Sequence, residues 1–219
     1  MTLTEVAEYL KLSERTILRL VHQGAFPGTK VGNQWRFLQF VIDDWLLTNG
    51  NKHTTRETRN NSRLLISALF DPAYILLNVK PGDKEAIFQQ LLHPFVENKL
   101  IKIPALLIQK LMYREQISST GIGNGVAFPH IRNPKENPPK LPPITAGICK
   151  EGTDFDAIDQ IPVNLIFLLN SNQEKVHLKI MSQLGYLLQN KLLRESLIKA
   201  SSEEEFIRII KDYELSGEE

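Results

Sequence analysis

The chain has 219 residues, which suggests one large domain or two unequal ones, and its 42% apolar and 23% charged residues are ordinary for a globular protein. Its one cysteine, Cys149, excludes an intramolecular disulfide and a cysteine-rich zinc site. The net charge of +1 gives no indication of the partners. The N-terminus is unlike a signal peptide and no run approaches roughly 18 apolar residues, which predicts a cytoplasmic protein without membrane insertion.

Two short helices joined by a tight turn are predicted at the N-terminus. Thr2 and Glu5 have the T-x-x-E spacing of a capping box, and the apolar periodicity that follows predicts a helix over residues 3–10. Ser13 is a favourable N-cap for a second helix, which ends near Gly24. Two helices joined by so short a turn form a helix-turn-helix.

A β-hairpin and a third helix are predicted to complete this small domain. Residues 29–31 and 35–37 read as two short strands around Gly32 and Asn33, with Trp35 in the core. The third helix is marked by the apolar residues Phe40, Val41, Trp45 and Leu46. We assign residues 1–47 to the small domain.

The segment LTEVAEYLKLSERTILRLVHQGAFPGTKVGNQWRF resembles the excisionase/MerR-type winged helix-turn-helix. The resemblance implies that the second helix enters the major groove of DNA and that the hairpin wing contacts the DNA backbone. Residues 1–63 carry nine Lys and Arg against six Asp and Glu, whereas the remainder carries 17 against 19. The expected DNA contacts are Arg15, Thr16 and Arg19 on the second helix and Lys30, Gln34 and Arg36 on the wing.

A solvated helix face is the alternative interpretation of Arg15 and Arg19, and the helix-turn-helix context favours DNA contact over it. One domain of this size has a small footprint on DNA. We therefore expect weak binding unless the protein forms a homodimer on its site.

A polar linker is predicted over residues 48–63, which contain no large apolar side chain and cannot bury enough surface to offset the entropy of ordering. The rest, residues 64–219, reads as one larger domain. The proline-rich stretch 133–143 is expected to be a loop within it, and residues 214–219 a frayed acidic tail.

Strands and helices alternate in the larger domain, which predicts an α/β fold with a mixed sheet and flanking helices. The expected strands cover residues 74–79, 126–128, 144–149 and 163–169. The expected helices cover residues 83–99, capped by Asp83, then 105–113, 176–189, and a last helix that Ser202 and Glu205 open and that runs through 210.

The segment STGIGNGVAFPHIRNP, residues 119–134, combines alternating glycines with a single proline-preceded histidine. It lacks the Gly-Lys-Ser/Thr of a Walker loop, and no helix-forming run follows as a dinucleotide fingerprint requires. Glycines allow close approach of backbone N–H groups to an anion, and Pro129 fixes the chain before His130. A histidine held in this way can attack phosphorus as a nucleophile. By contrast, His22, His53 and His93 read as surface or capping residues.

The longer segment YREQISSTGIGNGVAFPH, ending at His130, resembles the active-site segment of the enzyme IIA component of the sugar phosphotransferase system, of the fructose, mannitol and nitrogen type. The resemblance continues to about residue 213, with V-H-L-K-I at Val176. It implies that His130 accepts a phosphoryl group from the histidine phosphocarrier protein and passes it to a partner IIB domain. It implies no cofactor and no metal.

The resemblance also identifies further site residues. His177 matches the second active-site histidine of the family, and Arg114 matches an arginine whose guanidinium binds the transferred phosphoryl oxygens. Glu115 is expected to orient Arg114. The remaining expected phosphate contacts are Ser119, Thr120, Gly123 and Gly125. Phe128 departs from the Ile or Val that is usual before the proline, and its bulk is expected to crowd the pocket or the docking surface.

Three functions are compatible with these observations. The leading one is a regulator in which phosphorylation of His130 controls DNA binding by the helix-turn-helix. The second is a plain IIA component that relays phosphate to a separate IIB, with the N-terminal module used for protein docking. The third is an unphosphorylated interaction module.

Overall fold

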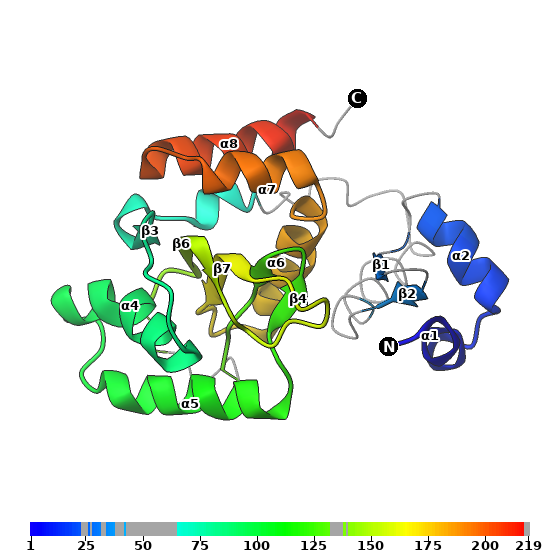
Figure 1. The fold of residues 1–219 in the computed structure, drawn as a ribbon, viewed down its shortest axis with the longest axis horizontal. Helices are drawn as coiled ribbons and strands as arrows, with labels where there is room; N and C mark the ends of the chain where they lie inside the picture. Colours follow the sequence, from blue (N-terminus) through cyan, green and yellow to red (C-terminus); the bar gives the residue numbers. More distant parts are fainter. Residues whose placement is uncertain are drawn as a thin grey trace, which may run out of the picture. The chain divides into compact units, whose positions relative to one another are not determined.

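The computed structural model describes residues 1–22, 26, 28–31, 34–37, 42, 65–131, 138 and 140–216. The chain divides into two compact units, Met1–Arg63 and Leu64–Glu219, which are described separately (Figure 1). The predicted linker, the four apolar markers of the third N-terminal helix, Gly24 and most of the proline-rich loop lie outside the described residues.

The first unit contains the predicted helix pair and hairpin. Helix α1 covers Leu3–Leu10 and begins with the expected capping box, while α2 covers Glu14–His22. Strands β1, Thr29–Val31, and β2, Gln34–Arg36, pair antiparallel. These elements enclose a small core of Val6, Ala7, Ile17, Phe26, Phe37 and Ile42, and Trp35 packs partly buried against it.

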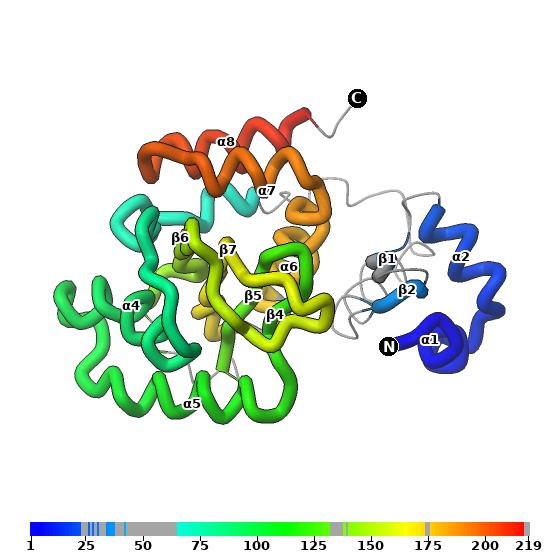
Figure 2. Tube along the Cα trace, in the orientation of Figure 1, coloured from blue at the N-terminus to red at the C-terminus, as the bar shows by residue number. Residues whose placement is uncertain are grey.

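The second unit is built on a five-stranded mixed sheet in the order β3-β6-β7-β5-β4. Its strands are β3 Ile75–Leu76, β4 Gly121–Gly123, β5 Val126–Ala127, β6 Ile144–Thr153 and β7 Val163–Leu169. The β6–β7 and β4–β5 pairs are antiparallel, whereas β3–β6 and β5–β7 are parallel (Figure 2). The predicted α/β fold with a mixed sheet is confirmed.

Helices cover both faces of this sheet. Helices α4, Lys84–Glu97, and α5, Pro104–Ile117, lie on one side, and α7, Lys191–Ile198, and α8, Glu203–Ser216, lie on the other (Figure 1). Helix α6, Glu174–Leu187, shares the side of α8, because the ring of Phe128 touches both Gly185 of α6 and Phe167, and Phe167 touches Phe206 of α8.

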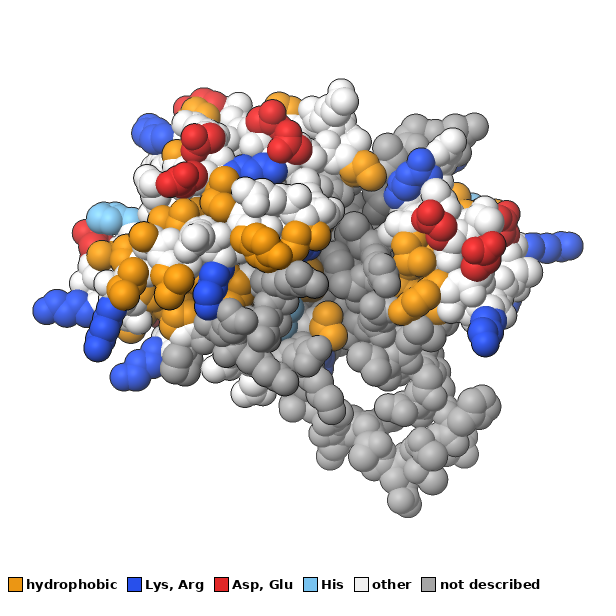
Figure 3. All heavy atoms as spheres, turned by 90° about the horizontal axis from the view of Figure 1, so that it is seen from below, with side chains coloured by type: hydrophobic (Ala, Val, Ile, Leu, Met, Phe, Trp, Pro, Cys, Tyr) orange, Lys and Arg blue, Asp and Glu red, His pale blue; other side chains and the backbone are white. Residues whose placement is uncertain are grey.

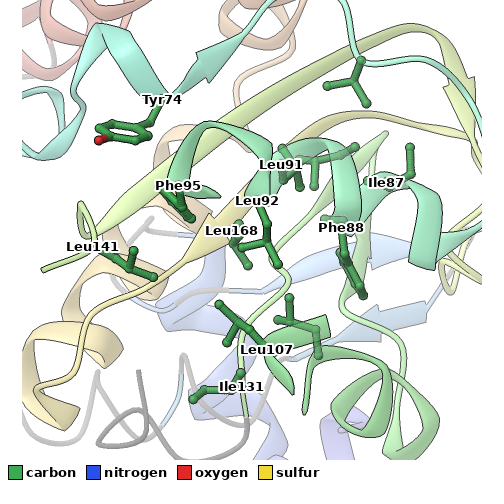
Figure 4. Packing of buried hydrophobic residues seen from close by; sticks show 14 of the residues in the cluster. Tyr74, Ile87, Phe88, Leu91, Leu92, Phe95, Leu107, Ile131, Leu141 and Leu168 are labelled. Atoms are coloured by element: carbon green, nitrogen blue, oxygen red, sulfur yellow. The ribbon is translucent and has the colours of Figure 1, made fainter. Parts of the chain in front are cut away.

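The apolar stripe of α4 anchors this arrangement. Its side chains at three- and four-residue spacing point into a core shared with α5 and the sheet, where they meet Leu107 and Leu168 (Figure 4). Burying each such side chain stabilises the fold by about 1.5–3 kcal/mol. The stripe consists of Ile87, Phe88, Leu91, Leu92 and Phe95, all with at most 1% exposure.

The structure differs from the sequence prediction in several elements, and strand β4 was not predicted. Strand β3 is shorter than the expected 74–79, because a 3-10 turn, Pro72–Tyr74, capped by Asp71, takes up its first residue and the chain turns again at residues 77 and 78. Helix α5 continues to Ile117, β6 continues to Thr153, and α7 was not predicted.

The expectation of a frayed tail from residue 214 was wrong. Helix α8 continues to Ser216, and the side chain of Glu214 is buried. Its carboxylate accepts hydrogen bonds from the backbone N–H groups of Ile66, at 2.5 Å, and Ser67, at 3.0 Å. The end of the second unit is thereby bound to its beginning.

Candidate functional site

His130 follows β5 at the edge where β7 ends. The backbone N–H of Leu169 donates to the carbonyl of Pro129 at 2.9 Å, which fixes the residue before the histidine. Nδ1 of the imidazole lies 2.8 Å from the carbonyl oxygen of Phe128. Because a carbonyl only accepts, Nδ1 carries the proton, and the lone pair of the ring resides on Nε2.

Arg114 contacts that second ring nitrogen. It lies in the last turn of α5, and its Nε donates to Nε2 of His130 at 3.1 Å. Its Nη1 donates to the backbone carbonyl of Ser118 at 2.7 Å, which orients the guanidinium plane. A planar guanidinium suits phosphoryl oxygens, since it offers several donors in a fixed geometry.

His177 completes the cluster from the first turn of α6. Its ring centroid lies 5.3 Å from that of His130, with the planes at 61°. The residue is only 3% exposed. Within the described part of the chain, its Nδ1 is buried without a hydrogen-bond partner. The fold therefore brings His130, Arg114 and His177 together from three separate segments.

Both histidines are held neutral. The pKa of His130 is lowered from 6.5 to about 3, chiefly by burial and also by the nearby Arg114 and His177, while the hydrogen bond to Phe128 opposes the shift. Burial alone lowers the pKa of His177 to about 4. At neutral pH, His130 therefore keeps the unprotonated nitrogen that a nucleophile requires.

These pKa shifts predict an acid-sensitive fold. Below pH 6.5 the unfolded chain binds protons on both histidines, whereas the folded chain does not until about pH 3 to 4. The free energy of unfolding should thus fall as pH drops, with a limiting slope of about 1.4 kcal/mol per pH unit for each histidine. Denaturant titrations from about pH 7.5 to about pH 5.5 measure this slope, and a His130→Gln, His177→Gln variant should flatten it. An equally steep slope in the variant would contradict the assignment.

The hydroxyls of Ser119 and Thr120 are directed to protein partners. Ser119 Oγ donates to the carbonyl of Phe155 and accepts from the N–H of Gly121 at 2.9 Å. The hydroxyl of the buried Thr120 donates to the carboxylate of Glu115. In this structure neither hydroxyl is directed at Nε2 of His130.

Gly123 and Gly125 form the tip of the β4–β5 hairpin, at the end of β5 opposite to His130. Both have positive φ, +93° and +73°, and the N–H of the intervening Asn124 donates to Asp159 Oδ2 at 2.7 Å. A Cβ on Gly123 would lie 2.9 Å from that oxygen. The two glycines thus make the turn, and in this structure Gly123 approaches the carboxylate of Asp159 and Gly125 the side chain of Asn164.

The expectation about Phe128 was wrong, and the expectation that Glu115 orients Arg114 stays a prediction. The carboxylate of Glu115 faces Thr120 and Lys84, with an Nζ–Oε2 distance of 3.1 Å to Lys84. Phe128 is buried in the core, with its ring 5.9 Å from that of Phe167, so its bulk does not crowd the histidine.

The sequence contained one unused signal for Glu115. It follows Leu107 and Leu111 at four-residue spacing, on the buried stripe of α5. A carboxylate on such a stripe requires partners, because an unpaired buried charge is unstable.

The candidate DNA contacts lie on α2 and the hairpin of the first unit. Arg15, Arg19, Lys30 and Gln34 are exposed. The hydroxyl of Thr16 hydrogen-bonds that of Ser13 at 2.8 Å, and Arg36 Nη2 donates to Gln34 Oε1 at 2.6 Å.

None of the described helices is long and apolar enough to span a membrane. Across the described ranges, no three His, Cys, Asp or Glu side chains are grouped to hold a metal ion.

A mixed sheet between two helical layers, with a desolvated histidine held between a carbonyl and an arginine, defines the class of IIA-type phosphotransfer domains. Residues 68–213 match the family model described as phosphoenolpyruvate-dependent sugar phosphotransferase system, EIIA 2, and the chain belongs to this family. Residues 1–50 match a model described as a helix-turn-helix domain.

Similar proteins come from several bacteria. The fructose-specific EIIABC component of Bacillus subtilis is 28% identical over 151 residues, which cover 68% of this chain but only 23% of that protein. The nitrogen regulatory protein of Pseudomonas aeruginosa is 31% identical, over 67% of this chain and 95% of that protein.

Solved structures share the fold of the second unit. The crystal structure of nitrogen regulatory protein IIA-Ntr from Neisseria meningitidis has a TM-score of 0.56 at 33% identity, covering 67% of this chain and 99% of that one. IIA mannitol from Escherichia coli, at 18% identity, shares the fold with a TM-score of 0.55, covering 64% of this chain and 98% of that one.

Proposed function

We propose that the protein is a phosphorylation-responsive regulator: His130 accepts a phosphoryl group from the histidine phosphocarrier protein, and the helix-turn-helix binds DNA. The observation that carries the proposal is the pair of contacts at His130. Nδ1 donates to the carbonyl of Phe128, and Nε2 accepts a hydrogen bond from Arg114. This arrangement leaves a defined lone pair for attack on phosphorus.

The proposed transfer exchanges one N–P bond for another. Nε2 of His130 attacks the phosphorus of the carrier's phosphohistidine, the N–P bond to the carrier breaks, and its electron pair returns to the carrier's nitrogen. The proton on Nδ1 of His130 stays hydrogen-bonded to Phe128. Arg114 rotates its donors from Nε2 to the phosphoryl oxygens, and a ring N–H of His177 adds a further hydrogen bond.

The phosphoryl oxygens are therefore bound by side chains rather than by the glycine turn. The hydroxyls of Ser119 and Thr120 already form hydrogen bonds with Phe155 and Glu115. We therefore propose that these two residues fix the segment before β4 and do not bind the phosphoryl group. The glycines of the hairpin tip are left out, since they lie at the other end of β5.

A surface beside Arg114 supports docking of the carrier protein. Tyr113 and Ile117 lie on the same turns of α5 and are 55% and 53% exposed. Figure 3 views the second unit from the side of α5, where exposed hydrophobic side chains lie among Lys and Arg side chains. An exposed apolar group next to a reactive residue is typical of a protein-binding surface.

The first unit supports DNA binding by its exposed basic helix. Arg15 and Arg19 are four residues apart on α2 and so lie on one face of it. We place α2 in the major groove, with Thr16 beside the two arginines, and the hairpin residues Lys30, Gln34 and Arg36 against the backbone. Because one such domain contacts only a small area of DNA, we propose that two copies of the protein bind to one DNA site.

We expect the Arg15→Ala, Arg19→Ala variant to bind DNA at least tenfold more weakly, because each lost base-edge or phosphate contact costs about 1–3 kcal/mol. Electrophoretic shift of fragments selected by the protein from a random-sequence pool measures this change. A Lys102→Ala, Lys150→Ala variant removes the same charge from exposed positions of the second unit and should bind as wild type does. An unchanged shift in the arginine variant would remove these residues from the interface.

The experiment that tests the whole proposal is this DNA shift with and without phosphorylation by phosphoenolpyruvate, enzyme I and the phosphocarrier. A regulator changes its affinity when His130 carries about two negative charges. If no DNA is selected, and the label passes to an added IIB protein, the second function, a plain IIA relay with an N-terminal docking module, replaces the first. If wild type gains no acid-labile phosphate, both phosphotransfer functions fail.

A further inference from the structure

Glu115, the neighbour of Arg114 in α5, is the centre of a charged network in which Glu115 is buried and Asp156 is exposed. Glu115 is 7% exposed, and its carboxylate accepts hydrogen bonds from the backbone N–H of Thr120, at 3.3 and 3.2 Å to its two oxygens, and from the Thr120 hydroxyl. The Nζ of Lys84 lies 3.1 Å from Glu115 Oε2 and 2.9 Å from Asp156 Oδ2. The family resemblance assigned Glu115 a different partner.

The backbone links this network to the imidazole in two steps. The carbonyl of Thr120 accepts the N–H of Phe128 at 3.0 Å, and the carbonyl of Phe128 accepts Nδ1–H of His130 at 2.8 Å. The carboxylate therefore fixes the strand segment that supplies the acceptor for Nδ1. The position of this acceptor therefore depends on where Thr120 is held by Glu115.

The same carboxylate also fixes the second partner of the ring. Glu115 adjoins Arg114 in the last turn of α5, so binding of its side chain to Thr120 and Lys84 holds that turn in place. The partner of Nδ1, the carbonyl of Phe128, and the partner of Nε2, Arg114, therefore both lie in segments that Glu115 holds in place.

The lysine is suited to stabilise this carboxylate. Although burial lowers the pKa of Lys84, hydrogen bonds to Asp156 and Glu115 outweigh that effect and raise the pKa, so the ammonium stays charged. Its Nζ also lies 5.7 Å from the ring centroid of Phe155, within the range of a cation–π contact. Removing only one member of a buried ion pair leaves the other charge uncompensated.

We propose that Glu115 is a positioning residue for phosphoryl transfer, which acts through Thr120 and Phe128 to hold His130 in the tautomer with its lone pair on Nε2. This inference rests on the proposed function of His130. Glu115 itself touches neither the phosphoryl group nor the reacting nitrogen.

The test combines a measurement of tautomer with a measurement of rate in the full chain. Nitrogen chemical shifts of 15N-labelled histidine report which ring nitrogen of His130 is protonated, and the His130→Gln spectrum assigns its signals. Initial rates of labelling from phosphoenolpyruvate, through enzyme I and the phosphocarrier, report function. The variants are Glu115→Gln, the same change with Lys84→Met, and Thr120→Val.

In Glu115→Gln the amide places a donor against the Lys84 ammonium. We expect the Nδ1–H tautomer to lose population and the rate to fall about tenfold, as for loss of a charged hydrogen bond. Adding Lys84→Met removes the clash and should restore both readouts to within about threefold of wild type. Thr120→Val should shift the tautomer in the same direction, and Glu85→Gln, at an exposed position of α4, should change neither.

An unchanged tautomer and rate in folded Glu115→Gln or Thr120→Val would overturn the inference. So would a double variant as impaired as the single one, because that pattern indicates general damage to the fold. The tautomer is measured without phosphate, so failure of wild type to accept phosphate refutes the proposed function and leaves the positioning test intact.

Discussion

Replacing His130 with glutamine is expected to abolish acid-labile phosphate on the protein, a loss of more than about a thousandfold in labelling rate, because no other group supplies the nucleophile. Glutamine is neutral, as the buried imidazole is, and offers an oxygen to the Nε of Arg114 that now contacts Nε2. The fold should therefore persist. Labelling with radioactive phosphoenolpyruvate, enzyme I and the phosphocarrier measures the effect.

His93 provides the matched control for this variant. It lies on α4 with an exposed side chain and pairs with Glu97 at 3.3 Å. His93→Gln should be labelled at the wild-type rate. If His130→Gln is labelled as well as His93→Gln, the phosphoryl group resides elsewhere and the site is wrongly assigned.

Replacing Arg114 with methionine is expected to slow phosphorylation of His130 by about a hundredfold to a thousandfold, the usual effect of losing one aligned donor to a transferring charged group. Methionine keeps much of the stem but removes the hydrogen bonds to Nε2 of His130 and to the carbonyl of Ser118. Single-turnover labelling at saturating phosphocarrier separates this chemical effect from weaker docking.

Arg208→Met is the control for the arginine variant, because Arg208 is exposed on α8 and forms an ion pair with Glu205 at 3.8 Å, on a helix that does not contribute to the site. It should leave the rate unchanged. A wild-type rate in Arg114→Met, with the circular dichroism spectrum preserved, would show that the guanidinium does not assist the transfer.

Sequence periodicity predicted the long elements of the fold. The four-residue spacing of apolar side chains in α4 and the continuous apolar run of β7 are strong local signals, and both elements appear with nearly the expected bounds. The short elements gave weak signals. Strand β4, Gly121–Gly123, was not predicted, because it exists through its pairing with β5 and a local sequence window does not contain that information.

The residues of the site were predicted better than their arrangement. His130, Arg114 and His177 come together as the family resemblance implied, although their roles in transfer stay predictions. The glycines show the limit of local reasoning: a G-x-G-x-G run permits close backbone approach to an anion, and here that anion is the carboxylate of Asp159. Which carboxylate or phosphate lies opposite such a turn depends on tertiary packing.

The bond between Glu214 and the backbone at residues 66 and 67 has a consequence for how this module is combined with others. It joins the last helix to the first turn of the second unit, so the two ends of that unit meet at one point on its surface. A domain with adjoining ends can be appended to another chain, or inserted into a loop, without stretching either fold. Because Glu214 holds residues 66 and 67, chain segments that leave the unit at its two described ends start close to each other.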